Sequence, residues 1–167
     1  MWSILDIVLC IISCIIPNIG GFVGSLFTET KDVPGTWYGD LDKPSFNPPT
    51  WVFLPAWTTF YILIGFAAFK VWHKEKTMHK RLTKLGMLAL TLYAIQLVLN
   101  WFWTPIFFNL QALGWAFFEI VILWVFVIAT TFLFFRIDLL GGLCMLPYCG
   151  WITFASILNF TLWQLNK

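Results

Sequence analysis

Charge and histidine are scarce in this 167-residue chain, and their scarcity excludes several kinds of chemistry. Only 11% of the residues are charged, against about 25% in a typical soluble domain. The two histidines, His73 and His79, lie in one basic segment, so a histidine-dependent hydrolase has no base in any apolar segment. Those segments also lack paired carboxylates, a metal-ligand cluster and a glycine-rich phosphate loop. Hydrolytic, metal-dependent and phosphate-binding chemistry can therefore be set aside.

Cysteine is also rare, and its placement does not suggest a disulfide or metal framework. The four cysteines lie inside apolar runs, and no two have the Cys-x-x-Cys spacing of common metal and redox motifs. Free cysteine behaves as a small buried apolar residue. We therefore expect neither a disulfide nor a metal site from Cys10, Cys14, Cys144 and Cys149. The net charge of +2 gives no indication of a nucleic-acid partner.

Apolar residues make up 60% of the sequence, and its mean hydropathy is +0.82. A helix needs about 20 apolar residues to cross the hydrocarbon core of a bilayer. Four uncharged runs approach or exceed this length, and they predict an integral multi-pass membrane protein. The runs cover residues 7–27, 51–69, 85–118 and 139–166.

The third run, of 34 residues, is too long for one spanning helix. Its segment TPIFFNLQALG, residues 104–114, contains proline, asparagine, glutamine and glycine, which favour a break. Backbone polar groups in lipid are satisfied only within helices or a closed barrel, and no strand-like alternation suggests a barrel. We therefore expect a single all-α transmembrane domain, a bundle of five helices. The expected helices cover residues 5–26, 49–70, 82–104, 112–135 and 139–164, and the first loop covers 27–48.

The charges that are present differ in sign between the first two loops. The first loop carries two lysines against four acidic residues, a net charge of −2. The second connection carries six basic residues against Glu75, a net charge of +5. With five spans, the N-terminus shares a face with this basic connection, and the C-terminus shares a face with the first loop. The positive-inside tendency places the basic face in the cytoplasm if the protein is bacterial.

Aromatic residues make up 20% of the chain, including 11 tryptophans, and many fall in one half of the expected bundle. That half lies nearest the first loop, and Trp151 would form its floor. An interfacial tryptophan belt with aromatic packing is one explanation. A flat, largely apolar ligand held between aromatic faces is another. The residues concerned are Trp37, Tyr38, Phe46, Trp51, Trp57, Trp101, Trp103, Phe107, Trp115, Phe160 and Trp163.

Polar side chains inside the expected spans include Gln96, Asn100, Glu119 and Asn159. Gln96 and Asn100 are four residues apart and share one helix face, whereas Asn159 lies in the last span and Glu119 in the fourth. Hydrogen bonds between helices are the simpler role for the three amides, and orientation of a ligand carbonyl is the alternative. Glu119 could pair across a subunit interface, line a cavity or stay protonated.

Five sequence blocks resemble one known family. They occur in the order and spacing of the translocator protein family, also called tryptophan-rich sensory proteins or peripheral-type benzodiazepine receptors. The resemblance covers residues 20–163, nearly the whole chain. The blocks are GGFVGS (20–25), WYGDLDKPSFNPPTWVFLPAWTTFY (37–61), LNWFWTPIFF (99–108), GWAFFEI (114–120) and LPYCGWITFASILNFTLW (146–163).

The resemblance implies five helices around a ligand cavity that the first loop covers as a lid, often in a homodimer. Members of this family bind lipophilic small molecules, namely porphyrins, sterols and synthetic benzodiazepine-site ligands. No separate cofactor or metal is implied. The resemblance places the chain in the mitochondrial outer membrane if it is eukaryotic and in the cell membrane or envelope if it is bacterial. Membrane lipid is therefore a further expected partner.

Carried over by position, the resemblance also implies eleven ligand-binding residues. Trp57 and Trp151 are the pair that light-driven porphyrin degradation, reported for some bacterial members, would need. The lid would contribute two residues, and the remainder would come from the helices. The full set is Ser25, Tyr38, Pro48, Trp57, Asn100, Trp103, Phe107, Trp115, Trp151, Ala155 and Leu158.

The sequence departs from the family at two places. Phe46 stands where members usually have tryptophan. Phe160 and Gln164 stand where the sterol-recognition pattern of the last helix has tyrosine and a basic residue. The resemblance therefore does not extend to that sterol motif, although it does include the main cavity.

Three functions follow as hypotheses. The first is a receptor or carrier for porphyrin- or sterol-like lipophiles, acting in their transport or in stress regulation. The second is a light-dependent protoporphyrin-degrading enzyme. The third is a regulatory scaffold that senses a ligand in the cavity and docks partners on the basic connection.

Two short motifs concern packing and the lid. The Gly20-x-x-x-Gly24 spacing favours close helix packing within the chain over dimerisation. Pro48-Pro49 suits a helix start, since proline has no N–H to lose there and its φ is already helical. Pro44 stiffens the segment before it. We therefore expect the second helix to begin at this proline pair and the preceding residues to form the rim of the lid.

Overall fold

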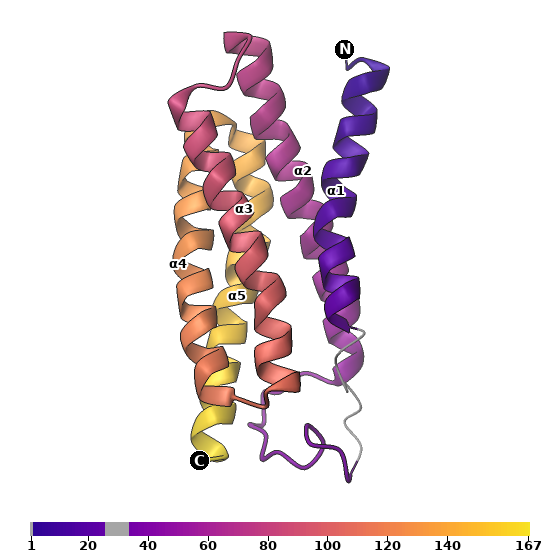
Figure 1. The fold of residues 1–167 in the computed structure, drawn as a ribbon, viewed down its shortest axis with the longest axis vertical. Helices are drawn as coiled ribbons and strands as arrows, with labels where there is room; N and C mark the ends of the chain where they lie inside the picture. Colours follow the sequence, from indigo (N-terminus) through magenta and orange to yellow (C-terminus); the bar gives the residue numbers. More distant parts are fainter. Residues whose placement is uncertain (1, 26–33) are drawn as a thin grey trace.

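The computed structural model describes residues 2–25 and 34–167, apart from the side chain of residue 25. Within these residues the chain forms five long helices and no strand (Figure 1). Each helix is long and apolar enough to cross a membrane. The predicted all-α bundle of five spanning helices is therefore confirmed. The helices are α1 (Ile4–Ser25), α2 (Phe53–His79), α3 (Lys84–Thr104), α4 (Leu113–Ile137) and α5 (Leu139–Leu165).

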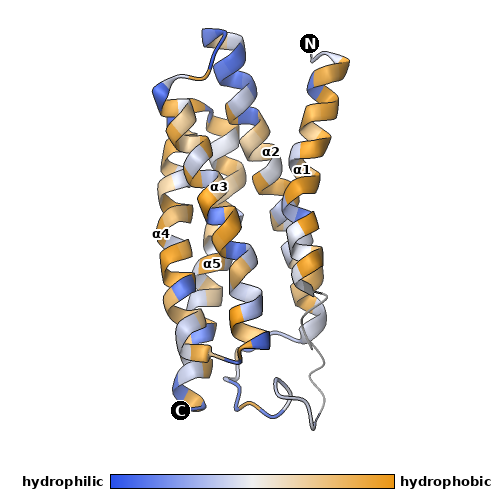
Figure 2. Ribbon diagram, in the orientation of Figure 1, coloured by the Kyte–Doolittle hydropathy of each residue, from blue (hydrophilic) through white to orange (hydrophobic). Residues whose placement is uncertain are grey.

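The helices are arranged so that α1 packs mainly on α2, while α4 packs on both α3 and α5. The N-terminus and the α2–α3 connection lie at one end of the bundle, called here the basic end (Figure 1). The C-terminus, the α3–α4 connection and residues 34–49 lie at the opposite end, called here the lid end. Figure 2 shows apolar residues along the helices and hydrophilic residues gathered at the α2–α3 connection. The distribution is that of a bundle with its apolar surface toward lipid.

The second helix is longer than the sequence predicted. Its expected end was residue 70, where the charged residues begin, but α2 continues to His79. Charge ends the apolar stretch but does not break a helix, because lysine and glutamate have good helix propensity. The helix stops where Lys80 adopts a left-handed conformation with φ of 59°.

The turn that follows is built around Glu75, which is only 4% exposed. Its carboxylate accepts a hydrogen bond of 2.7 Å from the backbone N–H of Thr83. The Thr83 hydroxyl in turn accepts from the backbone N–H of Gly86 at 3.1 Å, which caps the start of α3. Glu75, the acidic residue of the basic connection, thus stabilises the turn between α2 and α3.

The break predicted in residues 104–114 is present. The α-helical pattern of α3 ends at Thr104, and Pro105–Asn109 forms one wider turn of π-helix. Gln111 has a positive φ of 51° immediately before α4 begins. The break turns the chain back at the lid end, so that α3 and α4 run antiparallel.

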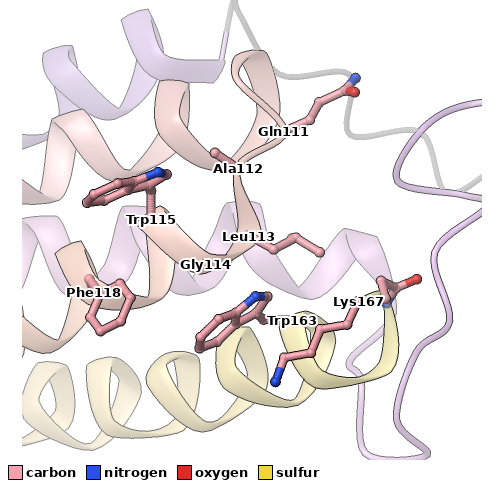
Figure 3. A pocket seen from close by; sticks show the side chains of 9 residues that line it. Gln111, Ala112, Leu113, Gly114, Trp115, Phe118, Trp163 and Lys167 are labelled. Atoms are coloured by element: carbon pink, nitrogen blue, oxygen red, sulfur yellow. The ribbon is translucent and has the colours of Figure 1, made fainter.

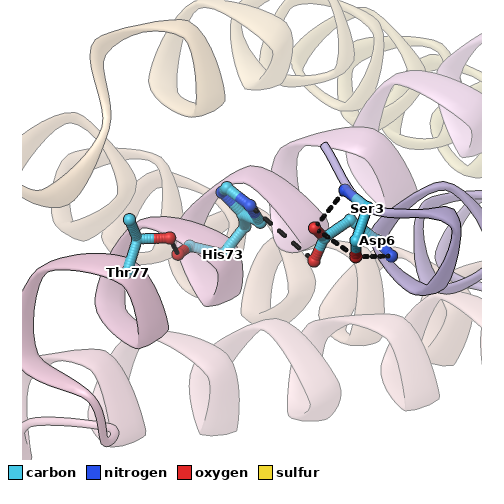
Figure 4. Close-up of polar contacts among 4 residues, drawn as sticks. All are labelled: Ser3, Asp6, His73 and Thr77. Atoms are coloured by element: carbon cyan, nitrogen blue, oxygen red, sulfur yellow. Dashed lines mark hydrogen bonds and ion pairs between the residues drawn. The ribbon is translucent and has the colours of Figure 1, made fainter. Parts of the chain in front are cut away.

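The start of α1 is tied to α2 at the basic end (Figure 4). Ser3 and Asp6 cap α1 reciprocally: the Asp6 N–H donates to the Ser3 hydroxyl at 3.1 Å, and the Ser3 N–H donates to the Asp6 carboxylate at 2.8 Å. The same carboxylate lies 3.8 Å from Nε2 of His73 on α2. This histidine therefore has a structural contact at the basic end, where its ring also lies 6.0 Å from that of Trp2 and 5.5 Å from that of Phe69.

Close packing of α1 depends on glycine. A Cβ at Gly20 would overlap the Trp101 ring, and one at Gly24 would lie 3.5 Å from Thr104, so both glycines pack within the chain. Closer to the basic end, the Ser13 hydroxyl donates to the Gly65 carbonyl at 2.8 Å. A Cβ at Gly65 would overlap the backbone of Ser13. Gly20 thus has the intrachain packing role that was expected for the glycine pair. The four cysteines are free in the structure.

We predict that Gly65→Ala destabilises the bundle, because backbone on α1 must move to admit the new methyl group. The free energy of unfolding should fall by about 1–3 kcal/mol, as is typical of overpacking. Unfolding by denaturant in detergent micelles, followed by tryptophan fluorescence, would measure it. The matched control is Gly150→Ala on α5, where an added Cβ meets no atom within 4 Å. Equal losses in the two variants would contradict this account of the α1–α2 contact.

Candidate ligand-binding cavity

A cavity of about 610 Å³ lies inside the lid end of the bundle. Its walls come from four helices, from the π-turn after α3 and from Tyr38 in the first loop. Phe22 and Leu54, which are 67% and 72% exposed, also line it, so the cavity mouth lies beside them. The lining residues are Asn18, Gly21, Phe22, Tyr38, Thr50, Phe53, Leu54, Trp57, Thr58, Tyr61, Trp103, Thr104, Phe107, Phe108, Trp151, Ala155, Leu158, Asn159 and Leu162.

One wall of the cavity is an aromatic cluster between α2 and α5. The rings of Trp57 and Trp151 lie 6.1 Å apart between centroids and are nearly perpendicular, at 88°. Phe53 lies 6.0 Å from Trp151, and Tyr61 lies 5.4 Å from Trp57. Phe53, Trp57 and Tyr61 are spaced four residues apart, which puts them on one face of α2. This face presents ring surfaces to the cavity.

A second part of the wall is formed by the end of α3 and the π-turn. Trp103 stacks on Phe107 with centroids 4.8 Å apart, and Phe107 meets Phe108 at the same distance. Trp37 and Tyr38 from the first loop lie against these rings, at 5.6 Å and 6.3 Å from Phe107. The first loop therefore contacts this wall directly.

The side-chain amide of Asn100 lies behind the cavity wall and holds the lining residue Tyr61 by a hydrogen bond. The Tyr61 hydroxyl donates a hydrogen bond to Asn100 Oδ1, and Asn100 Nδ2 donates to the Tyr148 hydroxyl at 3.0 Å. Three helices meet at this amide. Asn100 itself is buried and does not line the cavity, whereas Tyr61 does. The structure thus favours the interhelical role for this residue.

Asn159 has a comparable position on α5. Its Oδ1 accepts from the indole N–H of Trp103 at 3.0 Å, and its Nδ2 donates to the Leu113 carbonyl at 3.0 Å. Both polar atoms of this amide are therefore bonded within the protein. Gln96 and Glu119 differ, because their buried side-chain atoms find no hydrogen-bond partner in the described part of the chain. Neither of these two residues lines the cavity.

Ten of the eleven residues that the family resemblance implied fall into three groups in the structure. Two lie near the cavity without lining it: Asn100 lies behind Tyr61, and Pro48 precedes the short 3₁₀ turn of Thr50–Val52 that leads into α2. Ser25 ends α1, but its side chain lies outside the described residues. The third group lines the cavity and comprises Tyr38, Trp57, Trp103, Phe107, Trp151, Ala155 and Leu158.

Trp115 requires a correction, because it does not line the cavity. Its side chain is 75% exposed and borders a separate depression of about 340 Å³ beside Phe118 and Trp163 (Figure 3). The reason is helical geometry: Leu113 and Ala116 face inward, and a residue two positions after Leu113 points to the other side of the helix. Sequence order alone does not reveal this direction.

Several lining residues were not identified from the sequence. Phe53 and Tyr61 could have been found from their four-residue spacing on either side of Trp57, since such positions share a helix face. Asn18 and Gly21 on α1 have no comparable signal. Their place in the wall depends on how α1 crosses the bundle.

Comparison with known proteins agrees with this architecture. The TspO/MBR family model matches residues 13–164. The chain is 42% identical over 146 residues to Protein CrtK of Rhodobacter capsulatus, covering 87% of this chain and 85% of that protein. It is 40% identical over 169 residues to Tryptophan-rich protein TspO of Chlorobaculum tepidum, covering 98% of each. It is 35% identical over 150 residues to the human Translocator protein, covering 90% of this chain and 85% of the relative. With these matches spanning the five helices and the cavity, the chain belongs to the TspO/MBR family.

Proposed function

We propose that this membrane ligand-binding protein takes flat, largely apolar molecules, porphyrins first and sterol-like molecules second, into its aromatic cavity as a receptor or carrier. The observation that carries the proposal is the cavity itself, whose lining includes the rings of Trp57, Trp151, Trp103 and Phe107. Its volume of about 610 Å³ is within the range of small-molecule sites, about 300–1,000 Å³.

The polar groups of the wall support recognition by ring stacking. The indole N–H of Trp103 and the amide of Asn159 are bonded to each other, and the Tyr61 hydroxyl is bonded to Asn100. The Thr58 hydroxyl donates to the Leu54 carbonyl at 2.9 Å. With these groups engaged inside the protein, a ligand gains most from contact with aromatic faces and from leaving water. Among the lining residues, the Trp151 indole N–H is the buried donor without a partner in the described part of the chain, so it is left to meet an acceptor on the ligand. Planar tetrapyrroles and aromatic benzodiazepine-site ligands fit this chemistry better than a ligand rich in hydrogen-bonding groups.

Sterol-like ligands would use the same cavity. The position of the family's sterol motif on α5 is occupied by Phe160, which is 43% exposed and does not line the cavity. Ala155 and Leu158 on the same helix do line it. An apolar ring system could therefore contact α5 from the inside, without that motif.

We predict that Trp57→Ala weakens binding of protoporphyrin about tenfold. The lost ring contact corresponds to about 1.4 kcal/mol, within the range measured for aromatic pairs. Quenching of the remaining tryptophan fluorescence during a protoporphyrin titration would give the Kd, and competition with cholesterol would test the sterol. Trp115→Ala is the matched control, since it removes an exposed tryptophan outside the cavity. If both variants lose the same affinity, or neither loses any, the cavity is not the porphyrin site.

A second candidate function is light-dependent porphyrin modification, and one contact favours it. Trp57 and Trp151 touch edge to face and both line the cavity. A photoexcited porphyrin held there could take one electron from an indole and pass it to dioxygen, and the superoxide formed could then add to the porphyrin ring. Return of one electron from this adduct to the indole radical cation would restore the tryptophan, so that only porphyrin and dioxygen are consumed. This electron transfer needs a bound porphyrin and an indole next to it, and the two tryptophans supply the indole.

We predict that, if this activity exists, the Trp57→Phe/Trp151→Phe variant loses it while still binding protoporphyrin. Phenylalanine keeps a ring for stacking but is far harder to oxidise than indole. The measurement is loss of the porphyrin absorption under illumination in air, compared with a dark sample and with Trp115→Phe. Equal rates of loss for the wild-type protein and the double variant would leave binding without photochemistry as the function.

A further inference from the structure

We propose that Asn166 is a positioning residue that holds the lid over the cavity and thereby sets how long a ligand stays bound. The lid is defined here as residues 34–49, the described part of the first loop. The inference rests on the proposed function, since it concerns access to the same cavity. Asn166 lies just beyond α5, two residues past the segment that the family model matches.

The side-chain amide of Asn166 bonds both backbone polar groups of one lid residue. Its Oδ1 accepts from the Asp42 N–H at 2.9 Å, and its Nδ2 donates to the Asp42 carbonyl at 2.9 Å. The same Nδ2 donates to the Leu162 carbonyl near the end of α5 at 2.8 Å. Both N–H groups and the oxygen of the amide are therefore used. One side chain joins the lid to a helix across 124 residues of sequence.

The lid is braced internally around this attachment point. Asp40 accepts from the Gly35 N–H at 2.9 Å, and the Lys43 ammonium donates to the Gly39 carbonyl at 3.0 Å. The Tyr38 hydroxyl donates to Asn47 Oδ1 at 3.3 Å. These bonds couple the residues on both sides of Asp42. Opening of the lid therefore requires the hydrogen bonds of Asn166 to break as well.

The attachment is also close to the cavity wall. Tyr38 of the lid and Leu162 of α5 both line the cavity, and Leu162 is the residue whose carbonyl anchors Asn166. Phe46 of the lid meets Phe154 of α5 at 6.4 Å between ring centroids. Asn166 thus adds a directional, polar contact to the aromatic contacts between the lid and the bundle.

The effect of Asn166 on the binding kinetics can be predicted, because the ligand takes no part in the Asn166 hydrogen bonds. Losing them favours lid opening by the same factor with and without ligand, so association and dissociation should both accelerate while Kd stays nearly constant. Two hydrogen bonds of ordinary net strength correspond to an increase of about 5- to 30-fold in each rate. Damage to the cavity would instead change Kd, so the two effects can be separated.

The test compares Asn166→Ala with the wild-type full-length protein in lipid nanodiscs. Stopped-flow quenching of tryptophan fluorescence by protoporphyrin gives both rate constants, and hydrogen exchange of the lid amides reports opening without any ligand. We expect both rate constants and the exchange of residues 40–43 to rise about 5- to 30-fold. Unchanged exchange in Asn166→Ala, or a raised Kd with unchanged exchange, would overturn the proposal.

Two further variants test the geometry. Asp42→Ala should leave the lid closed, because Asn166 bonds the backbone of residue 42 and not its side chain. Gln164→Ala removes a neighbouring exposed amide that does not contact the lid and should also behave as wild type. A large effect of either variant would contradict the attachment. If wild-type protein does not bind protoporphyrin, the proposed function fails for that ligand, and the exchange measurement alone decides the role of Asn166.

Discussion

Lipid offers the peptide backbone no hydrogen-bond partner, and the rest of this structure depends on that constraint. It requires continuous helices across the membrane, and it also requires polar side chains in the spans to find partners inside the protein. Asn100 and Asn159 meet this requirement by bonding to Tyr61, Tyr148 and Trp103. Two of those aromatic residues line the cavity. These two asparagines therefore serve to fix the orientation of aromatic walls, whereas the buried amide of Gln96 has no hydrogen-bond partner in the described part of the chain.

The two ends of the bundle are packed differently as a result. Toward the basic end, aliphatic side chains make up much of the interior, with Ile64, Ala67, Val71 and Met145 fully buried in the same core cluster as the ring of Phe134. Toward the lid end, large planar rings meet at steep angles, as Trp57 and Trp151 do. Rigid planes that meet edge to face cannot fill the corner between them as flexible aliphatic chains would. The ligand cavity occupies the end of the membrane protein where the rings are concentrated.

Sequence patterns were sufficient for the fold and for the half of the bundle that holds the cavity. Length and hydropathy predict five spans because the bilayer imposes a fixed thickness, and TPIFFNLQALG predicts the turn because proline and glycine interrupt helices. The direction of a side chain around its helix is harder, since it depends on which face meets a neighbour. Trp115 shows this, as it lies in a block shared with the family yet faces outward. The role of Asn166 could not be predicted at all, because its partner is 124 residues away and is backbone.

Helix α2 continues past its expected end to His79 at the basic end, and this extra length affects how deep the bundle sits in the bilayer. With 27 residues, this helix is about 40 Å long at 1.5 Å per residue, whereas the hydrocarbon core is about 30 Å thick. The cationic turns that carry Lys74 and Lys76, both exposed, must stay at or beyond the headgroups. These charged turns therefore determine how deep the whole bundle sits in the bilayer. The depth of the cavity mouth in the bilayer is then determined by residues on the opposite side of the membrane. A change in bilayer thickness therefore changes which part of the lipid the mouth faces.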